Sequence, residues 1–223
     1  MLRRLDATYG RRSWTIDPTR SPLDELIQTI LSQHTSDLNS ERAFRSLTER
    51  FAAWEEVAAA STEDVADAIR CGGLADQKAR TILRVLARLL IDGKANPLGD
   101  LYSLPLGEAK ARLGALPGVG PKTTACVLLF ACGRPALPVD THVYRVARRI
   151  GLIDAHVSPE RAHDQLEQLL APDDVYPFHV GMITHGRRIC QARAPRCDIC
   201  ALVDCCDHGR HSRRATGALE VSP

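Results

Sequence analysis

A lysine directly follows a turn of two glycines and two prolines in the segment LPGVGPKTTACVLL, residues 116–129. The chain has only four lysines among its 29 basic residues, so arginine is its usual cation. If Pro121 is the first residue of a helix, Lys122 is the second, where the helix dipole disfavours an ammonium. A neutral amine can act as a nucleophile and form a Schiff base, whereas a guanidinium cannot. Lys122 is therefore a candidate nucleophile, and a cation that contacts a phosphate is the alternative.

The turn before this lysine has the composition of an anion-binding loop. Gly118 and Gly120 allow the backbone to approach a ligand closely, and the N–H groups of a turn that enters a helix can surround a phosphate. The two glycines predict a DNA phosphate site between two helices, a helix-hairpin-helix. The alternative is that the two glycines only make a tight connection between helices.

A carboxylate, Asp140, lies eighteen residues after the lysine in the segment PVDTHVYRV. Its position predicts an N-cap for the next helix, a role that keeps the carboxylate ionised. A carboxylate held in this way can also stabilise positive charge on a sugar ring while a glycosidic bond breaks, or help to deprotonate a nucleophile. The spacing alone does not decide between capping and catalysis.

Four cysteines near the C-terminal end have the spacing C-x6-C-x2-C-x5-C. Four thiolates in one short segment indicate a tetrahedral metal or an iron–sulfur cluster, and zinc stays open as the alternative. Cys205 would shorten the last gap and is left out of this set. The remaining cysteines, in apolar surroundings, are predicted to be core thiols. The four proposed ligands are Cys190, Cys197, Cys200 and Cys206, and the predicted core thiols are Cys71, Cys126 and Cys132.

Arginines surround the first of these ligands. Arg187 and Arg193 are candidates for contact with DNA phosphates, as are their neighbours Arg188 and Arg196. The alternative is an ordinary solvated surface, because the formal net charge of the chain is only +2 and proves no nucleic-acid partner.

The elements that must position these residues are predicted to be helices, because alternating strand patterns are almost absent. The segment SPLDELIQTILSQHTSD has helical apolar spacing behind an N-cap at Ser21 and a proline at position 22. Asp140 is expected to open a helix that Gly151 closes. Further helices are expected near residues 44–51, 65–69, 79–90, 108–113, 121–131, 158–170 and 177–190.

The bulk composition fits a folded chain of 223 residues with 44% hydrophobic content. No secretory signal pattern and no long apolar run are seen, which predicts a soluble, cytoplasmic protein. The last segment, HSRRATGALEVSP, is expected to be frayed.

Together these segments resemble the endonuclease III family of helix-hairpin-helix DNA glycosylases. The resemblance covers residues 23 to 206 and rests on LPGVGPKTTACVL, VDTHVYRVARRIGL and the four-cysteine spacing, in this order. LIQTILSQHTSD and GGLADQKARTIL also look like family segments.

The resemblance implies an all-α fold of two domains with the active site in the cleft between them. A six-helix barrel would span residues 23–133, and an iron–sulfur domain holding a 4Fe-4S cluster would combine residues 1–22 with 134–223. The implied activity is removal of oxidised pyrimidines, such as thymine glycol, with abasic-site lyase activity by β-elimination. The expected partner is double-stranded DNA with damaged bases or abasic sites, and the enzyme is expected to be a monomer.

The resemblance also assigns roles to single residues. Lys122 would be the nucleophile, Asp140 the essential carboxylate, and Leu74 a wedge opposite the extruded nucleotide. The phosphate-binding hairpin would comprise Gly118, Val119 and Gly120. Many relatives have a glutamine in a segment LSAQATD that fills the space left by the extruded base. Here LSQHTSD places His34 at that position and Gln33 one residue earlier. His142 matches a position near the damaged strand, with a helix-surface histidine as the alternative.

Two other functions are weighed against this one. A mismatch-type glycosylase without lyase activity is the nearest, but Lys122 argues against it because such relatives lack the imine-forming amine. The other is a non-catalytic DNA-binding module stabilised by a zinc knot. A zinc protein would be colourless, whereas an iron–sulfur cluster would make it yellow-brown.

Overall fold

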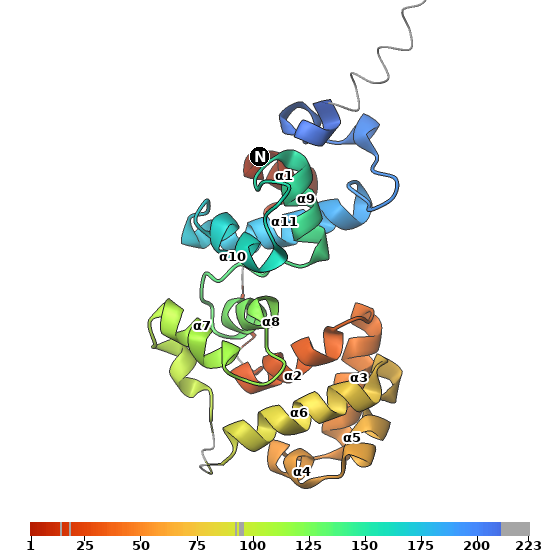
Figure 1. Ribbon diagram of the computed structural model, residues 1–223, viewed down its shortest axis with the longest axis vertical. Coiled ribbons are helices and arrows are strands. Elements are labelled where there is room, and N and C mark those ends of the chain that lie inside the picture. Colours follow the sequence, from red (N-terminus) through yellow and green to blue (C-terminus); the bar gives the residue numbers. More distant parts are fainter. Residues whose placement is uncertain (14, 18, 92, 94–95, 211–223) are drawn as a thin grey trace, which may run out of the picture. The chain divides into compact units, whose positions relative to one another are not determined.

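The computed structural model describes residues 1–210 except residues 14, 18, 92, 94 and 95. Every regular element of this described part is helical and none is a strand, so the prediction of an all-α fold is confirmed (Figure 1). No helix within it is long and apolar enough to cross a membrane. The α-helices are α1 (Leu2–Tyr9), α2 (Pro22–Ser32), α3 (Asp37–Arg50), α4 (Trp54–Ala59), α5 (Thr62–Ala68), α6 (Ala75–Leu89), α7 (Leu106–Gly114), α8 (Pro121–Cys126), α9 (Thr141–Ile150), α10 (Pro159–Glu167) and α11 (Val175–Arg188).

Helices α2 to α8 form one compact unit, Ile16–Arg134. Helix α2 is the central element of this unit because it packs against α3, α6 and α8 (Figure 1). Its predicted apolar positions are all buried, which confirms the helical spacing read from the sequence. They are Leu23, Leu26, Ile27, Ile30 and Leu31.

The start of α2 explains why the chain becomes helical there. The Ser21 hydroxyl accepts a hydrogen bond from the Asp24 N–H at 3.1 Å, and the Asp24 carboxylate accepts one from the Ser21 N–H at 2.9 Å. This reciprocal capping box satisfies two N–H groups that the helix cannot pair internally, and Pro22 fills the first helical position. The predicted N-cap is confirmed.

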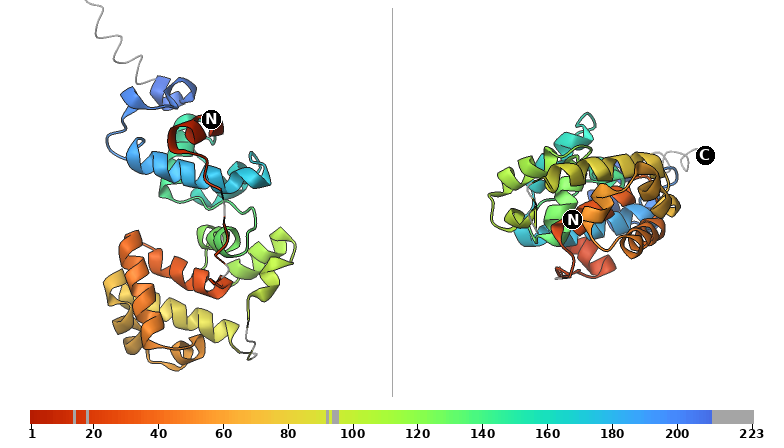
Figure 2. Two further views of the ribbon diagram at one scale, coloured as in Figure 1. Left: turned by 180° about the vertical axis from the view of Figure 1, so that it is seen from behind. Right: turned by 90° about the horizontal axis from the view of Figure 1, so that it is seen from below.

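The second unit combines both ends of the chain, Met1–Thr15 and Pro135–Pro223. Helix α1 packs against α11, and α11 packs against α9; Figure 2 shows α1 in red beside the blue α11. The two helices approach closely at Gly181, where an added Cβ would lie 3.4 Å from Leu5, at van der Waals contact. Full burial of a leucine such as Leu5 contributes about 1.5–3 kcal/mol. This contact therefore anchors α1, whose N-cap residue provides no side-chain hydrogen bond.

Four features differ from the sequence-based expectation or add to it. Helices α1 and α4 were not predicted; both are short and lack a capping side chain. The helix expected to reach Ala131 ends in a π-helical turn, Val127–Ala131. Cys71 is exposed, so its prediction as a core thiol was wrong; it lies in a surface 3-10 turn, Arg70–Gly72, where no apolar face covers it. Residues 211–223, expected to be frayed, lie outside the described residues.

Candidate active site and cysteine centre

The glycine turn between α7 and α8 has the backbone shape that the sequence predicted. Gly118 has φ +77°, in the left-handed region, and a Cβ there would lie 2.8 Å from Cγ2 of Thr81. Any larger residue would meet both strain and a clash. Gly118 and Gly120 are exposed, whereas the Val119 side chain is 6% exposed and packs inward. Only backbone groups of this turn are therefore presented to a ligand.

Lys122 is the second residue of α8, directly after the N1 proline, as predicted. The next two residues, Thr123 and Thr124, are each 4% exposed, so the lysine lies at the edge of the core and is half-buried. Gln33 at the end of α2 donates a hydrogen bond to Oγ1 of Thr123 at 3.5 Å. The amide of Gln33 thus lies against the residue that follows Lys122.

A buried carboxylate lies within electrostatic reach of Lys122. Glu25 is 7% exposed, accepts a hydrogen bond from the Thr29 hydroxyl at 3.2 Å and forms an ion pair with Arg20 at 3.5 Å. Burial raises the pKa of Glu25, while the charges of Arg20 and Lys122 act in the opposite direction. Glu25 was not predicted as a site residue, since its position is that of an ordinary first-turn acid of α2.

Two residues expected to contact DNA have unusual backbone conformations. His34 has φ 53° and Leu74 has φ 50°, and they are the only non-glycine residues with positive φ in the described part of the chain. Such a conformation costs a non-glycine residue about 1–3 kcal/mol and persists only where the surroundings enforce it. Leu74 is also 52% exposed, and it lines a shallow surface pocket with Arg70 and Arg80.

Asp140 caps α9, as the sequence predicted. Its Oδ1 atom accepts hydrogen bonds from the N–H groups of His142 at 2.9 Å and Val143 at 2.8 Å. Both bonds go to Oδ1, and within the described residues no hydrogen bond to Oδ2 is seen. His142 is half-buried, and its Nδ1 lies 3.1 Å from the guanidinium of Arg145, which can only donate.

Three side chains hold the segment that leads into Asp140. The N–H of Leu137 donates to Glu167 at 2.9 Å, and His179 Nδ1 lies 2.9 Å from the carbonyl of Pro138. The N–H of Val139 donates to Nε2 of His163 at 3.1 Å. Because Nδ1 of His163 lies 3.0 Å from the Pro159 carbonyl, the two bonds require the neutral ring with its proton on Nδ1.

Burial of His163 makes the stability of this unit pH-dependent. Desolvation lowers the pKa of His163 below its ordinary 6.5, although Asp164 and Glu167 act against this shift. The unfolded chain therefore binds the proton first as the pH falls through about 6.5, and folding stability is lost below that pH. We expect the melting temperature of His163→Gln to decrease less between pH 7 and pH 5 than that of the parent protein. The amide oxygen of glutamine can still accept the hydrogen bond from the Val139 N–H.

The control for this prediction is His156→Gln, because His156 is exposed. It should keep the pH dependence of the parent protein. An equally steep pH dependence in His163→Gln would show that His163 is not the group responsible.

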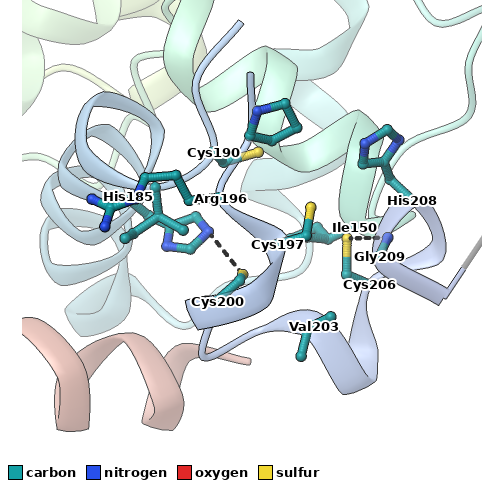
Figure 3. A pocket seen from close by; sticks show the side chains of 12 residues that line it. Ile150, His185, Cys190, Arg196, Cys197, Cys200, Val203, Cys206, His208 and Gly209 are labelled. Atoms are coloured by element: carbon teal, nitrogen blue, oxygen red, sulfur yellow. Dashed lines mark hydrogen bonds between the residues drawn. The ribbon is translucent and has the colours of Figure 1, made fainter. Parts of the chain in front are cut away.

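The four cysteines line one pocket beyond the end of α11 (Figure 3). Cys197 begins the 3-10 turn Cys197–Ile199, Cys200 directly follows it, and Cys206 follows the turn Val203–Cys205. The thiol of Cys205 instead donates to the carbonyl of Leu202 at 3.3 Å. Residues 197–206 thus bring three of the sulfurs to the same pocket as Cys190.

N–H groups point at several of these sulfurs. Arg149 donates to Sγ of Cys190 at 3.4 Å, and the Gly209 N–H donates to Sγ of Cys206 at 3.4 Å. His185 Nε2 lies 3.6 Å from Sγ of Cys200, and Tyr9 holds the other ring nitrogen of that histidine at 2.9 Å (Figure 3). Donors in these places stabilise thiolates, the form in which cysteine binds metals.

The protein by itself disfavours the ionised form of these thiols. Burial raises the pKa of Cys200 and Cys206, and the charges of the neighbouring cysteines raise it further. Four thiolates would repel one another in this pocket unless a cation lay between them. Within the described ranges, however, no three ligand-type side chains converge closely enough to hold a single metal ion.

Two arginines of α9, which were not predicted as site residues, hold residues 190–206 in place. These residues, which carry the four proposed ligands, are called the cysteine segment below. Arg145 donates to the carbonyls of Cys190 at 3.0 Å and Gly186 at 2.9 Å. Arg149 donates to the carbonyls of Gln191 at 2.6 Å and Ala192 at 2.8 Å. Their spacing of four residues on one helix face was the available signal. By contrast, Arg187 and Arg193 are exposed.

A family model describes the class to which this fold and site belong. The model of HhH-GPD superfamily base excision DNA repair proteins matches residues 27–172, which include the glycine turn, Lys122 and Asp140. The chain is therefore a base excision DNA repair protein.

Individual relatives narrow this class. Endonuclease III of Thermotoga maritima is 37% identical over 220 residues, which cover 98% of this chain and 95% of the relative. An Arabidopsis thaliana protein described as a DNA glycosylase is 35% identical over 184 residues, 82% of this chain but 63% of the plant protein. A solved structure of a trapped covalent intermediate between endonuclease III and DNA superposes with a TM-score of 0.79 at 29% identity, covering 96% of this chain and 95% of that one. The chain belongs to the endonuclease III family of DNA glycosylases.

Proposed function

We propose that the protein removes oxidised pyrimidines of the thymine glycol type from double-stranded DNA and then cleaves the abasic site by β-elimination. The observation that carries this proposal is Lys122, an amine at the second position of a helix that follows an exposed glycine turn. A relative trapped as a covalent intermediate with DNA supports the same chemistry. Monofunctional removal of a base would not need an amine at this position.

The proposed reaction assigns a step to each of two residues. Nζ of Lys122 bonds to C1′ of the sugar as the bond from C1′ to the base breaks, and the base leaves with the electron pair and takes up a proton. Oδ2 of Asp140 stabilises the positive charge that develops on the sugar at this stage. The amine then loses its protons, the C1′–O4′ bond breaks and O4′ is protonated, which leaves an imine between C1′ and Nζ.

The imine makes the second reaction possible. It acidifies C2′, which loses a proton while the C3′–O bond breaks and the 3′ phosphate leaves with the electron pair. Water then hydrolyses the imine and returns Lys122 as a free amine. Arginine at position 122 could carry out none of these steps, which accounts for a lysine in an arginine-rich chain.

Other residues are proposed to bind and distort the DNA. The backbone of Gly118, Val119 and Gly120 would bind a phosphate, since only backbone groups of this turn are exposed. Leu74 would insert into the base stack, and Gln33 or His34 would fill the space that the extruded base leaves. His142 would lie near the damaged strand.

The exposed Arg187 and Arg193 are proposed to contact phosphates. Arg187→Glu combined with Arg193→Glu should weaken DNA binding and reduce the slope of log affinity against log salt by about two, because two phosphate contacts are lost. The same charge change at Arg84 and Arg88, exposed on α6, is the control. Unchanged DNA binding by the variant with both Arg187→Glu and Arg193→Glu would show that these arginines do not contact DNA.

Cys190, Cys197, Cys200 and Cys206 are proposed to bind a 4Fe-4S cluster, which would cross-link Cys190, just after the end of α11, to residues 197–206. Their fit is supported by the shared pocket and by N–H donors that point at the sulfurs. Zinc stays the alternative occupant of four clustered thiolates, and metal analysis separates the two. If the cluster is bound, purified protein is expected to contain iron and acid-labile sulfide; zinc alone would contradict the cluster.

We also propose the domain roles that the resemblance implied. A six-helix barrel would comprise residues 23–133, and an iron–sulfur domain would comprise residues 1–22 and 134–223. The two compact units Ile16–Arg134 and Met1–Thr15 with Pro135–Pro223 support this division. We propose that the protein is cytoplasmic and associates with the nucleoid when it acts on DNA.

Borohydride trapping tests the proposed function. The protein would be incubated with duplexes that contain a thymine glycol or an abasic site, and borohydride would reduce any imine to a stable amine. A covalent protein–DNA product is expected with both duplexes. Base release without a covalent product would instead identify a monofunctional glycosylase, and binding without base release would identify a DNA-binding module.

A further inference from the structure

We propose that Lys78 is a positioning residue that holds the Leu74 turn and the His34 segment together for extrusion of a nucleotide. The inference rests on the proposed function, since it concerns how the same enzyme distorts DNA. Lys78 itself does not contact the reacting atoms; it acts through the two segments that its side chain joins.

The geometry around Lys78 is that of a buried clamp. The side chain is 3% exposed, and its ammonium donates to the carbonyl of Leu31 at 2.7 Å and to that of Gly72 at 2.9 Å. A buried lysine is rare unless its charge is paired or hydrogen-bonded. Burial lowers the pKa of Lys78, so the two carbonyls are what keep the ammonium in this position.

The two carbonyls belong to segments that are far apart in the sequence. Leu31 lies in the last turn of α2, three residues before His34, and its carbonyl is at the negative end of the helix dipole, where a cation is favoured. Gly72 ends the 3-10 turn Arg70–Gly72, two residues before Leu74. One cation therefore joins the segment proposed to fill the empty base position to the turn that carries the proposed wedge.

Lys78 also fixes Leu74 through the backbone. The N–H of Lys78 donates to the Leu74 carbonyl at 3.0 Å, which makes Leu74 the N-cap residue of α6. Both residues with strained positive φ, His34 and Leu74, thus lie within three residues of a carbonyl that Lys78 holds. A hydrophobic side chain at position 78 would fill the space but release both carbonyls, so this contact would hold the two segments in register rather than fill the core.

The test compares Lys78→Met with Leu86→Ala, a variant that removes fully buried apolar volume from the same helix. The probe is a duplex that contains 2-aminopurine beside a non-cleavable abasic analogue, because fluorescence of this base rises when stacking is lost. A parallel assay measures base release from thymine glycol in duplex and in single-stranded DNA. Circular dichroism confirms that each variant is folded.

We expect Lys78→Met to lose about 10-fold or more of its base release from the duplex and most of the fluorescence rise, but to keep its rate on single strands within about 2-fold. Leu86→Ala should change both substrates equally. In a Leu74→Ala background, Lys78→Met should add less than about 2-fold, since the two residues act as one unit. Equal losses on both substrates, or additive losses with Leu74→Ala, would show a merely structural role and overturn the proposal.

The two readouts separate this inference from the proposed function. Extrusion fluorescence that depends on Lys78, without any base release by the parent protein, would refute the proposed activity and support the positioning role. Base release from the duplex at the same rate by the parent and by Lys78→Met would support the proposed activity and refute the positioning role of Lys78. If Lys78→Met does not fold, Lys78→Gln, which retains N–H donors, takes its place with the same expected pattern at smaller amplitude.

Discussion

Replacement of Lys122 by glutamine is expected to abolish covalent trapping and to reduce cleavage of abasic sites by at least about 10³-fold. The amide of glutamine cannot attack C1′ or form an imine, so no alternative route to β-elimination is left. Fold stability should change little, because Lys122 is half-buried at the start of α8, and loss of a positive charge at that end relieves an unfavourable interaction with the helix dipole.

Two further variants make the Lys122 result specific. Lys110→Gln removes a half-buried lysine from α7, in the other helix of the hairpin, and should trap normally. Lys122→Arg keeps the positive charge, so it should bind DNA as the parent does but form no covalent product. Borohydride trapping by Lys122→Gln would mean that a different amine is the nucleophile.

Asp140→Asn is expected to slow base release by about 10²–10³-fold while the protein remains folded. Asparagine caps helices about as well as aspartate, and its carbonyl oxygen can accept the same bonds from the N–H groups of His142 and Val143. The variant therefore removes the negative charge and leaves the cap, so the loss in rate measures electrostatic stabilisation of the sugar cation. The measurement is single-turnover base release beside thermal unfolding.

Asp140→Ala separates capping from catalysis. It removes both functions and should lower stability by about 1 kcal/mol in addition to the loss in rate. If Asp140→Asn released bases at the rate of the parent, the carboxylate would be a helix cap alone, which was the other interpretation of this residue.

The features that the sequence predicted well depend on neighbours along the chain. The capping box at Ser21, the cap at Asp140 and the left-handed Gly151 at the end of α9 each involve residues within a few positions of one another. Helices α1 and α4 lack such signals, and α1 depends on packing against α11 from the other end of the chain. Periodicity and capping therefore identify helices that are stabilised by residues nearby in the sequence, but not those that depend on tertiary contacts.

The same distinction applies to the candidate site. Lys122 and the four cysteines belong to compact motifs, so their chemistry could be proposed from type and spacing. Lys78 binds a carbonyl 47 residues away, and Val139 binds His163, 24 residues away, so no local pattern indicated either contact. Arg145 and Arg149 hold the cysteine segment from a distance of more than 40 residues. Sequence reasoning found the groups proposed to react and missed those that hold them.

The pairing of α1 with α11 has a consequence for how the protein is made. Ribosomes add about 5–20 residues per second, and a unit can fold once its chain has emerged. Ile16–Arg134 is continuous, so it can fold early, whereas α1 must wait for α11, which ends at Arg188, about 180 residues and roughly 10–40 s later. The cysteine segment emerges after that. The proposed 4Fe-4S cluster would therefore be inserted late in synthesis or after it, into a chain whose unit Ile16–Arg134 can already have folded.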